Sequence, residues 1–153
     1  MFGSKFKAVI EAARAQVAEL IGARPTEIVF TSRATDSTNA AIHAALKANP
    51  AMKHIVTSAM EHSSVLNYCM ALEKDGYGVT YLPVDRDGLP KLADLENAIT
   101  DETAVGSLTW AYNETGALFR VREIAEFCGI PAKPARINVH PPAATLGLAS
   151  GRG

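Results

Sequence analysis

Two spacings of apolar residues alternate along the first 128 residues of the chain and predict helices and strands in turn. From residue 5 to residue 21 apolar side chains recur at every third or fourth position, the period of an amphipathic helix, and Gly22 follows where a helix-ending glycine is expected. Short runs rich in β-branched residues predict strands over residues 27–31, 54–58, 79–82 and 104–110. Helix-forming residues predict further helices over 40–48, 63–74, 92–99 and 121–128.

The alternation of these elements predicts a three-layer α/β fold, with a mainly parallel sheet and helices on both of its faces. Neighbouring parallel strands need a crossover connection, which a helix provides, and no hairpin turn joins the expected strands. Ligands of such sheets bind beyond the carboxyl ends of the strands. We therefore expect the chemistry of this protein in the loops that follow the strands.

The pattern ends near residue 128. Residues 129–153 contain four prolines and close on small and polar residues. Proline has a fixed φ angle and no backbone N–H group, so this composition favours an irregular conformation. We expect residues 1–128 to form one domain and residues 129–153 to form an irregular tail.

Composition excludes several classes of protein. The 153 residues are 48% hydrophobic and 20% charged, which is typical of a soluble domain with one core, and the net charge of −1 gives no basic surface for nucleic acid. No apolar leader or bilayer-length apolar stretch is present, so a cytoplasmic location without membrane contact is expected. Cys69 and Cys128 lie in predicted helices without zinc-like spacing, which indicates packed thiols and no metal site.

Two loops carry residues that suit a phosphorylated or aromatic ligand. Residues 31–39 place Thr35 before a helix, where backbone N–H groups and the helix dipole favour a phosphate, although Thr35 or Ser37 could simply cap that helix. The loop after residue 58 carries His62, whose ring could stack on a planar cofactor or move a proton, or could be an ordinary surface or core residue. No glycine-rich dinucleotide or P-loop motif is present.

A third loop follows the strand predicted over residues 104–110. Its Asn113 could donate a hydrogen bond to a phenolate or carboxylate oxygen, and Gly116 permits a tight turn. The same residues could form nothing more than a turn.

Taken in order, these segments resemble the cysteine desulfurases of the class V aminotransferase group. The matching stretches are residues 27–35, 54–65, 79–88 and 110–116, which end respectively in Ala-Thr, Glu-His-Ser-Ser-Val, Asp-x-Asp-Gly and Asn-Glu-Thr-Gly. The Trp-Ala pair at Trp110 and a later Ala-Leu-Phe resemble the nitrogen-fixation branch, which supplies sulfur for nitrogenase iron–sulfur clusters. The resemblance covers residues 5–128, which is part of a family member.

The resemblance implies a transferase that uses pyridoxal 5′-phosphate to convert L-cysteine to alanine and a protein-bound persulfide. It implies that Thr35 and the backbone at Ala34 hold the cofactor phosphate. His62 would lie over the pyridine ring and assist proton transfer, and Asn113 would bond the phenolic oxygen or the substrate carboxylate. A homodimer and an iron–sulfur scaffold protein as sulfur acceptor are also implied.

The sequence departs from the family at several positions. Arg33 stands where a small residue is usual in the phosphate loop, and Tyr112 where asparagine is common. After Cys128 neither the strand with the pyridinium-pairing Asp nor the Ser-x-His-Lys motif is recognisable, so Lys133 and His140 receive no role. The family's sulfur-accepting cysteine lies further downstream.

These departures predict a truncated chain with a replaced end that is inactive alone. Two alternatives stay open. The chain could be a non-catalytic remnant or interaction module, or it could derive from a selenocysteine lyase-like enzyme, which shares these motifs.

Overall fold

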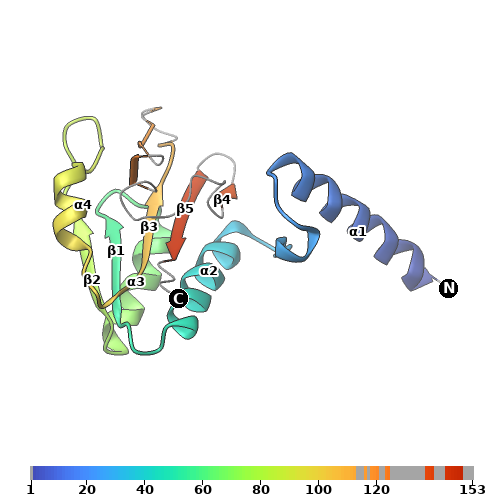
Figure 1. Ribbon diagram of the computed structural model, residues 1–153, viewed down its shortest axis with the longest axis horizontal. Helices are drawn as coiled ribbons and strands as arrows, with labels where there is room; N and C mark the ends of the chain where they lie inside the picture. Colours follow the sequence, from blue (N-terminus) through green and yellow to red (C-terminus); the bar gives the residue numbers. More distant parts are fainter. Residues whose placement is uncertain are drawn as a thin grey trace. The chain divides into compact units, whose positions relative to one another are not determined.

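The computed structural model describes residues 2–112, 116, 118–120, 123–124, 137–139 and 144–149. The chain divides into two compact units, Met1–Ser32 and Arg33–Gly153. The first unit is built around one long helix, and the second contains the sheet (Figure 1). The division expected near residue 128 remains a prediction. No helix in the described ranges combines the length and the apolar character needed to cross a bilayer.

The first unit begins with helix α1, Phe2–Leu20. Its end is a Schellman-type turn: Gly22 has a φ of 66°, and the N–H of Ala23 donates to the carbonyl of Ala18 at 2.8 Å. The predicted helix and its terminal glycine are therefore confirmed. The short 3-10 helix η1, Pro25–Glu27, follows.

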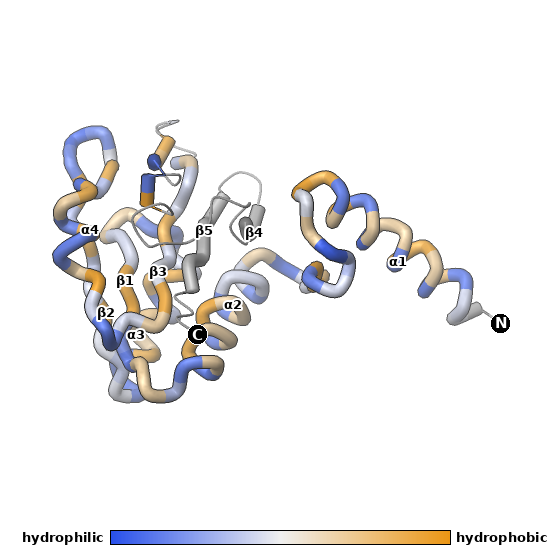
Figure 2. The backbone as a smooth tube through the Cα atoms, in the orientation of Figure 1, coloured by the Kyte–Doolittle hydropathy of each residue, from blue (hydrophilic) through white to orange (hydrophobic). Residues whose placement is uncertain are grey.

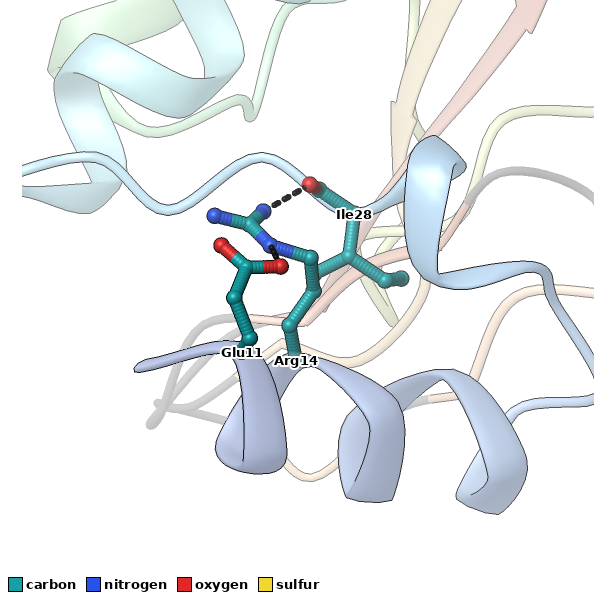
Figure 3. A network of polar contacts seen from close by, with 3 residues as sticks. All are labelled: Glu11, Arg14 and Ile28. Atoms are coloured by element: carbon teal, nitrogen blue, oxygen red, sulfur yellow. Dashed lines mark hydrogen bonds and ion pairs between the residues drawn. The ribbon is translucent and has the colours of Figure 1, made fainter. Parts of the chain in front are cut away.

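The strand predicted over residues 27–31 is wrong. Ile28 is extended, with φ −94° and ψ 126°, but no strand in the described part of the chain pairs with this segment. A side chain of α1 holds it instead, since Arg14 pairs with Glu11 and donates to the Ile28 carbonyl (Figure 3). An extended segment becomes a strand only when a neighbour completes its backbone hydrogen bonds, and apolar spacing predicts the conformation without the neighbour.

Within the described residues the second unit holds a five-stranded sheet in the order β2-β1-β3-β5-β4. The strands β1 (His54–Ser58), β2 (Gly78–Leu82) and β3 (Thr103–Thr109) are parallel, as predicted. Strand β1 lies between the other two. Strand β5 (Ala144–Ala149) runs antiparallel to β3, and β4 (Ile137–Val139) runs antiparallel to β5.

The strands β4 and β5 lie in the region expected to be irregular. Residues 144–149 contain no proline, so all of their backbone N–H groups are available to a ladder. They pair with the edge of β3 that β1 leaves open. These strands were not predicted, because the prolines of the surrounding region favoured an irregular conformation for the whole segment.

Helices cover both faces of the sheet, which confirms the predicted fold class. Helices α2 (Ala34–Ala48) and α3 (Ser63–Lys74) pack together with one buried cluster, and α4 (Leu92–Ala98) packs with the other. Ile55 and Val56, neighbours in β1, are both fully buried and belong to opposite clusters. Figure 2 shows hydrophobic stretches within both β1 and β3. Burying one such side chain contributes roughly 1.5–3 kcal/mol.

Helix α2 begins at Ala34, well before the residue 40 expected from the sequence. Threonine, serine and aspartate are poor residues inside helices, which favoured a loop over residues 31–39. They are well tolerated in a first turn, where Asp36 also faces the positive end of the helix dipole. Thr35 therefore lies within the first turn of the helix.

Candidate functional site

Helices α2 and α3 begin at the edge of the sheet that is formed by the carboxyl ends of β1 and β3 (Figure 1). Helix α3 follows β1 and runs back along the sheet, and α2 precedes β1 and packs beside α3. The N-terminal ends of both helices thus lie at one edge. A helix N-terminus attracts anions because its first N–H groups lack intrahelical partners and its dipole is positive there.

The N-terminal end of α2 carries Ala34 and Thr35. Arg33 occupies the N-cap position in an extended conformation, φ −150° and ψ 159°, and its side chain makes no capping hydrogen bond. Thr35 and Ser37 lie inside the helix, and the Ser37 hydroxyl donates to the Arg33 carbonyl at 3.5 Å, so neither residue is the cap. The simple capping interpretation of these two residues is therefore wrong.

His62 is the N-cap residue of α3. Its Nδ1 accepts a hydrogen bond from the backbone N–H of Ser64 at 3.1 Å and lies 2.8 Å from the Ser64 hydroxyl oxygen. A ring nitrogen that accepts from an N–H carries no proton, so the neutral ring carries its proton on Nε2. The side chain is exposed. This capping role was not predicted from the sequence, and it holds the ring at the start of the helix.

Glu61, the residue before His62, is a buried acid with only 5% of its surface exposed. Its Oε1 accepts from the backbone N–H of Thr109 at 2.5 Å, and its Oε2 accepts from the Thr109 hydroxyl at 2.6 Å. The Ser58 hydroxyl donates to Oε1 at 3.4 Å. Burial raises the pKa of Glu61 to about 7, against the opposing effect of these donors.

Tyr112 extends this set of contacts. It is buried, and its hydroxyl lies 3.0 Å from the Ser58 hydroxyl oxygen. Burial raises the pKa of the Tyr112 phenol. The tyrosine that departs from the family pattern therefore fills a buried position and has a polar partner. These contacts were not predicted from the sequence. The available signal was an acid in the short loop after a predicted strand, directly before a histidine.

The remaining site predictions have mixed outcomes. Asn113 lies outside the described residues, as do Cys128, Lys133 and His140. Gly116 has the positive φ expected for a tight turn, 71°, and its N–H donates to the Tyr112 carbonyl at 2.8 Å. Cys69 is fully buried, and burial raises its pKa to about 11, so the packed-thiol prediction is confirmed.

The described contacts do not join every predicted site residue. Among the described residues, no hydrogen bond or ion pair links Thr35 to His62, although both lie at helix starts on one edge. The buried amide oxygen of Asn39, one turn after Thr35, has no hydrogen-bond partner. This atom is an acceptor, which a phosphate oxygen cannot satisfy, so Asn39 is not a phosphate ligand through that oxygen.

A cavity of about 540 Å³ lies away from these helix starts, between α4 and β2. His54 lines it, and both ring nitrogens of His54 lie within hydrogen-bond distance of threonine hydroxyls, at 2.8 Å from Thr103 and 2.9 Å from Thr80. Its histidine is thus fully paired. The residues that the structure describes contain no group of three or more side chains suited to a metal ion.

A protein-family comparison matches residues 1–131 to the family described as aminotransferase class V. Cysteine desulfurase 2 of Trichormus variabilis is 46% identical over 139 residues, which are 91% of this chain and 34% of the relative. The mitochondrial cysteine desulfurase of Drosophila melanogaster is 44% identical over 128 residues, 83% of this chain and 28% of the relative.

Solved structures show the same relation. A NifS-like protein matches with a TM-score of 0.78 and 32% identity, over 87% of this chain and 36% of that one. A structure titled SspA in complex with cysteine matches with a TM-score of 0.75 and 36% identity, over 84% of this chain and 38% of that one. The chain thus spans about a third of the length of its relatives.

Proposed function

Because the chain belongs to the class V aminotransferase family, we propose that it forms part of the cofactor-binding domain of a pyridoxal-phosphate-dependent cysteine desulfurase. One observation carries the proposal: α2 and α3 begin at the same edge of the sheet, with Thr35 in the first turn of one and His62 capping the other. Relatives named cysteine desulfurase that match most of the chain support it.

Two parts of the proposed cofactor have candidate ligands among the described residues. The backbone at Ala34 and the Thr35 side chain would hold the phosphate at the start of α2, which has no side-chain cap. The exposed ring of His62 would lie over the pyridine ring, with its Nε2–H available to hold or move a proton. Asn113 would bond the phenolic oxygen or the substrate carboxylate. When bound, pyridoxal phosphate supplies the electron withdrawal that activates cysteine.

The proposed substrate is L-cysteine, and the products are alanine and a protein-bound persulfide. The relative whose structure is titled a complex with cysteine supports this substrate. A homodimer, an iron–sulfur scaffold protein as sulfur acceptor, a cytoplasmic location and membership in the nitrogen-fixation branch belong to the same proposal.

We propose further that the 153 residues have no desulfurase turnover alone. The sequence contains no Ser-x-His-Lys motif for a covalent anchor. The buried Cys69 cannot accept sulfur, because burial keeps its thiol protonated and out of reach. Sulfide release from cysteine with added cofactor, lost on substitution of His62, would contradict this part of the proposal.

Cofactor binding tests the rest. Trp110, the single tryptophan, directly follows β3 and reports binding at this edge through its fluorescence. Pyridoxine 5′-phosphate, which lacks the aldehyde, separates binding from reaction with surface lysines. We expect saturable binding of both compounds, competition by inorganic phosphate and no borohydride trapping at a defined lysine.

A matched pair of variants locates the ring. His62→Asn keeps a side-chain cap for α3 but removes the aromatic ring, so it should weaken binding by about tenfold, a typical value for one lost aromatic contact. His43→Asn, on an exposed histidine of α2, should leave affinity unchanged. Equal affinity of the His62→Asn variant and the unsubstituted protein would refute the ring assignment.

A further inference from the structure

The loop that carries His62 is fastened to the end of β3 by one side chain. Glu61 lies between β1 and α3 in sequence, and both of its carboxylate oxygens bond Thr109, the last residue of β3. Because both the backbone N–H and the hydroxyl of Thr109 donate to Glu61, the loop after β1 is held in a fixed position against the end of β3. Ser58, the last residue of β1, donates to the same carboxylate.

We propose that Glu61 is the positioning residue of this site: it holds the His62 loop against the carboxyl end of β3, so that the His62 ring keeps its place at the start of α3. This inference rests on the proposed function for the role of the ring, and on the Glu61 contacts alone for the positioning. No catalytic role is assigned to Glu61, since it is buried.

Burial of the Glu61 carboxylate is unfavourable in free energy. A buried carboxylate loses its hydration, and none of the ion pairs in the described part of the chain supplies Glu61 with a cation. Hydrogen bonds from Thr109 and Ser58 take that place. An apolar side chain would fill the same space without desolvation, but it could not accept these bonds.

Glu61 connects two parts of the candidate site, the loop that carries His62 and the segment that follows β3. His62 follows Glu61 directly, and its Nδ1 is committed to the Ser64 N–H. On the other side, Thr109 is followed by Trp110 and by Tyr112, whose hydroxyl reaches Ser58. A shift of the Glu61 carboxylate therefore moves the histidine loop relative to the segment that leads to Asn113.

Three variants divide the contacts of Glu61. Glu61→Ala removes every bond of the carboxylate. Glu61→Gln keeps one oxygen for the Thr109 N–H, and its amide NH₂ can donate to the Thr109 hydroxyl oxygen, so it is the conservative rescue. Thr109→Val removes only the hydroxyl bond, in a side chain of nearly the same shape. Glu96→Gln, on an exposed glutamate of α4, is the matched control.

The first readout needs no cofactor. Nuclear magnetic resonance of the His62 ring nitrogens reports whether Nδ1 remains an acceptor with the proton on Nε2. We expect Glu61→Ala to average the two tautomers, Thr109→Val to shift the same signals in part, and Glu61→Gln and Glu96→Gln to leave them in place. If Glu61→Ala does not fold, the His62 signals of Thr109→Val alone test the proposal. Unchanged His62 signals in every folded variant among Glu61→Ala and Thr109→Val would overturn the proposal.

The second readout is the dissociation constant for pyridoxine 5′-phosphate. Glu61→Ala should weaken binding by about tenfold, the factor expected for about one net hydrogen bond, and Glu61→Gln should restore it to within about twofold. Equal weakening in Glu61→Ala and Glu61→Gln would overturn the positioning role, because their bonding to Thr109 differs. If the unsubstituted protein binds no cofactor, the proposed function fails, while the His62 signals still test the positioning.

Discussion

Glu61→Gln is expected to change how the stability of the protein depends on pH. Burial raises the pKa of Glu61 from its ordinary value of 4.5 to about 7, so between these values the folded protein retains a proton that the unfolded chain has lost. Where the folded state binds more protons, the free energy of unfolding falls as the pH rises. The contribution is therefore most favourable below about pH 4.5 and is lost by about pH 7.

The size of the effect follows from the two pKa values. Their difference, from 4.5 to about 7, multiplied by about 1.4 kcal/mol for each pKa unit, gives a loss of about 3 kcal/mol across this range. Solvent screening reduces the value little, because only 5% of the Glu61 surface is exposed. A glutamine has no proton to lose at these pH values, so the variant lacks this term. The difference is a large fraction of the roughly 5–15 kcal/mol that stabilises a domain.

Urea unfolding followed by Trp110 fluorescence measures this difference at a series of pH values from about 4.5 to about 8. Histidines and other acids also contribute to the pH dependence, and comparison of the two proteins cancels them. From the low to the high end of the range, the unsubstituted protein should lose about 3 kcal/mol more than Glu61→Gln. Glu96→Gln should follow the unsubstituted protein. Parallel stability curves for Glu61→Gln and the unsubstituted protein would show that the pKa of Glu61 is not raised in the folded state.

Three further changes test the packing and the helix cap. His62→Ala should destabilise the protein by about 1 kcal/mol through loss of the α3 cap, whereas His62→Asn should cost little; equal losses in urea unfolding would contradict the cap. Ile55→Ala, at a fully buried site in the central part of the sheet, should cost about 2–5 kcal/mol, and a near-neutral value would place β1 outside the core. Cys69 should resist alkylation until urea unfolds the chain; rapid modification of its peptide under native conditions, read by mass spectrometry, would contradict its burial.

Local patterns predicted the parallel part of the fold well. The predicted bounds of β1 and α3, 54–58 and 63–74, agree with the structure, because each has a clear period and a polar segment at its end. Helix α2 was predicted too short, since its threonines and serine are unfavourable inside a helix but acceptable in its first turn. The spacing of apolar residues thus predicts where a single helix or strand lies along the chain.

Features that depend on distant partners were not predictable in the same way. Residues 27–31 have the composition of a strand but no partner strand in the described part of the chain. Residues 144–149 lie in a proline-rich region and nevertheless pair with β3. Glu61 was missed because its meaning depends on Thr109, which is far along the sequence. Thr35 and His62 could be predicted as candidate ligands because each stands at a recognisable junction before a helix, and their role as ligands remains a prediction.

The edge formed by the starts of α2 and α3 is the proposed binding site for a phosphorylated pyridine. The most direct test is a backbone amide titration by nuclear magnetic resonance, with pyridoxine 5′-phosphate added to the isotope-labelled protein. We expect saturable shifts centred on Ala34, Thr35 and His62. Shifts confined to the cavity between α4 and β2, or no saturable shifts at any amide, would contradict this proposal.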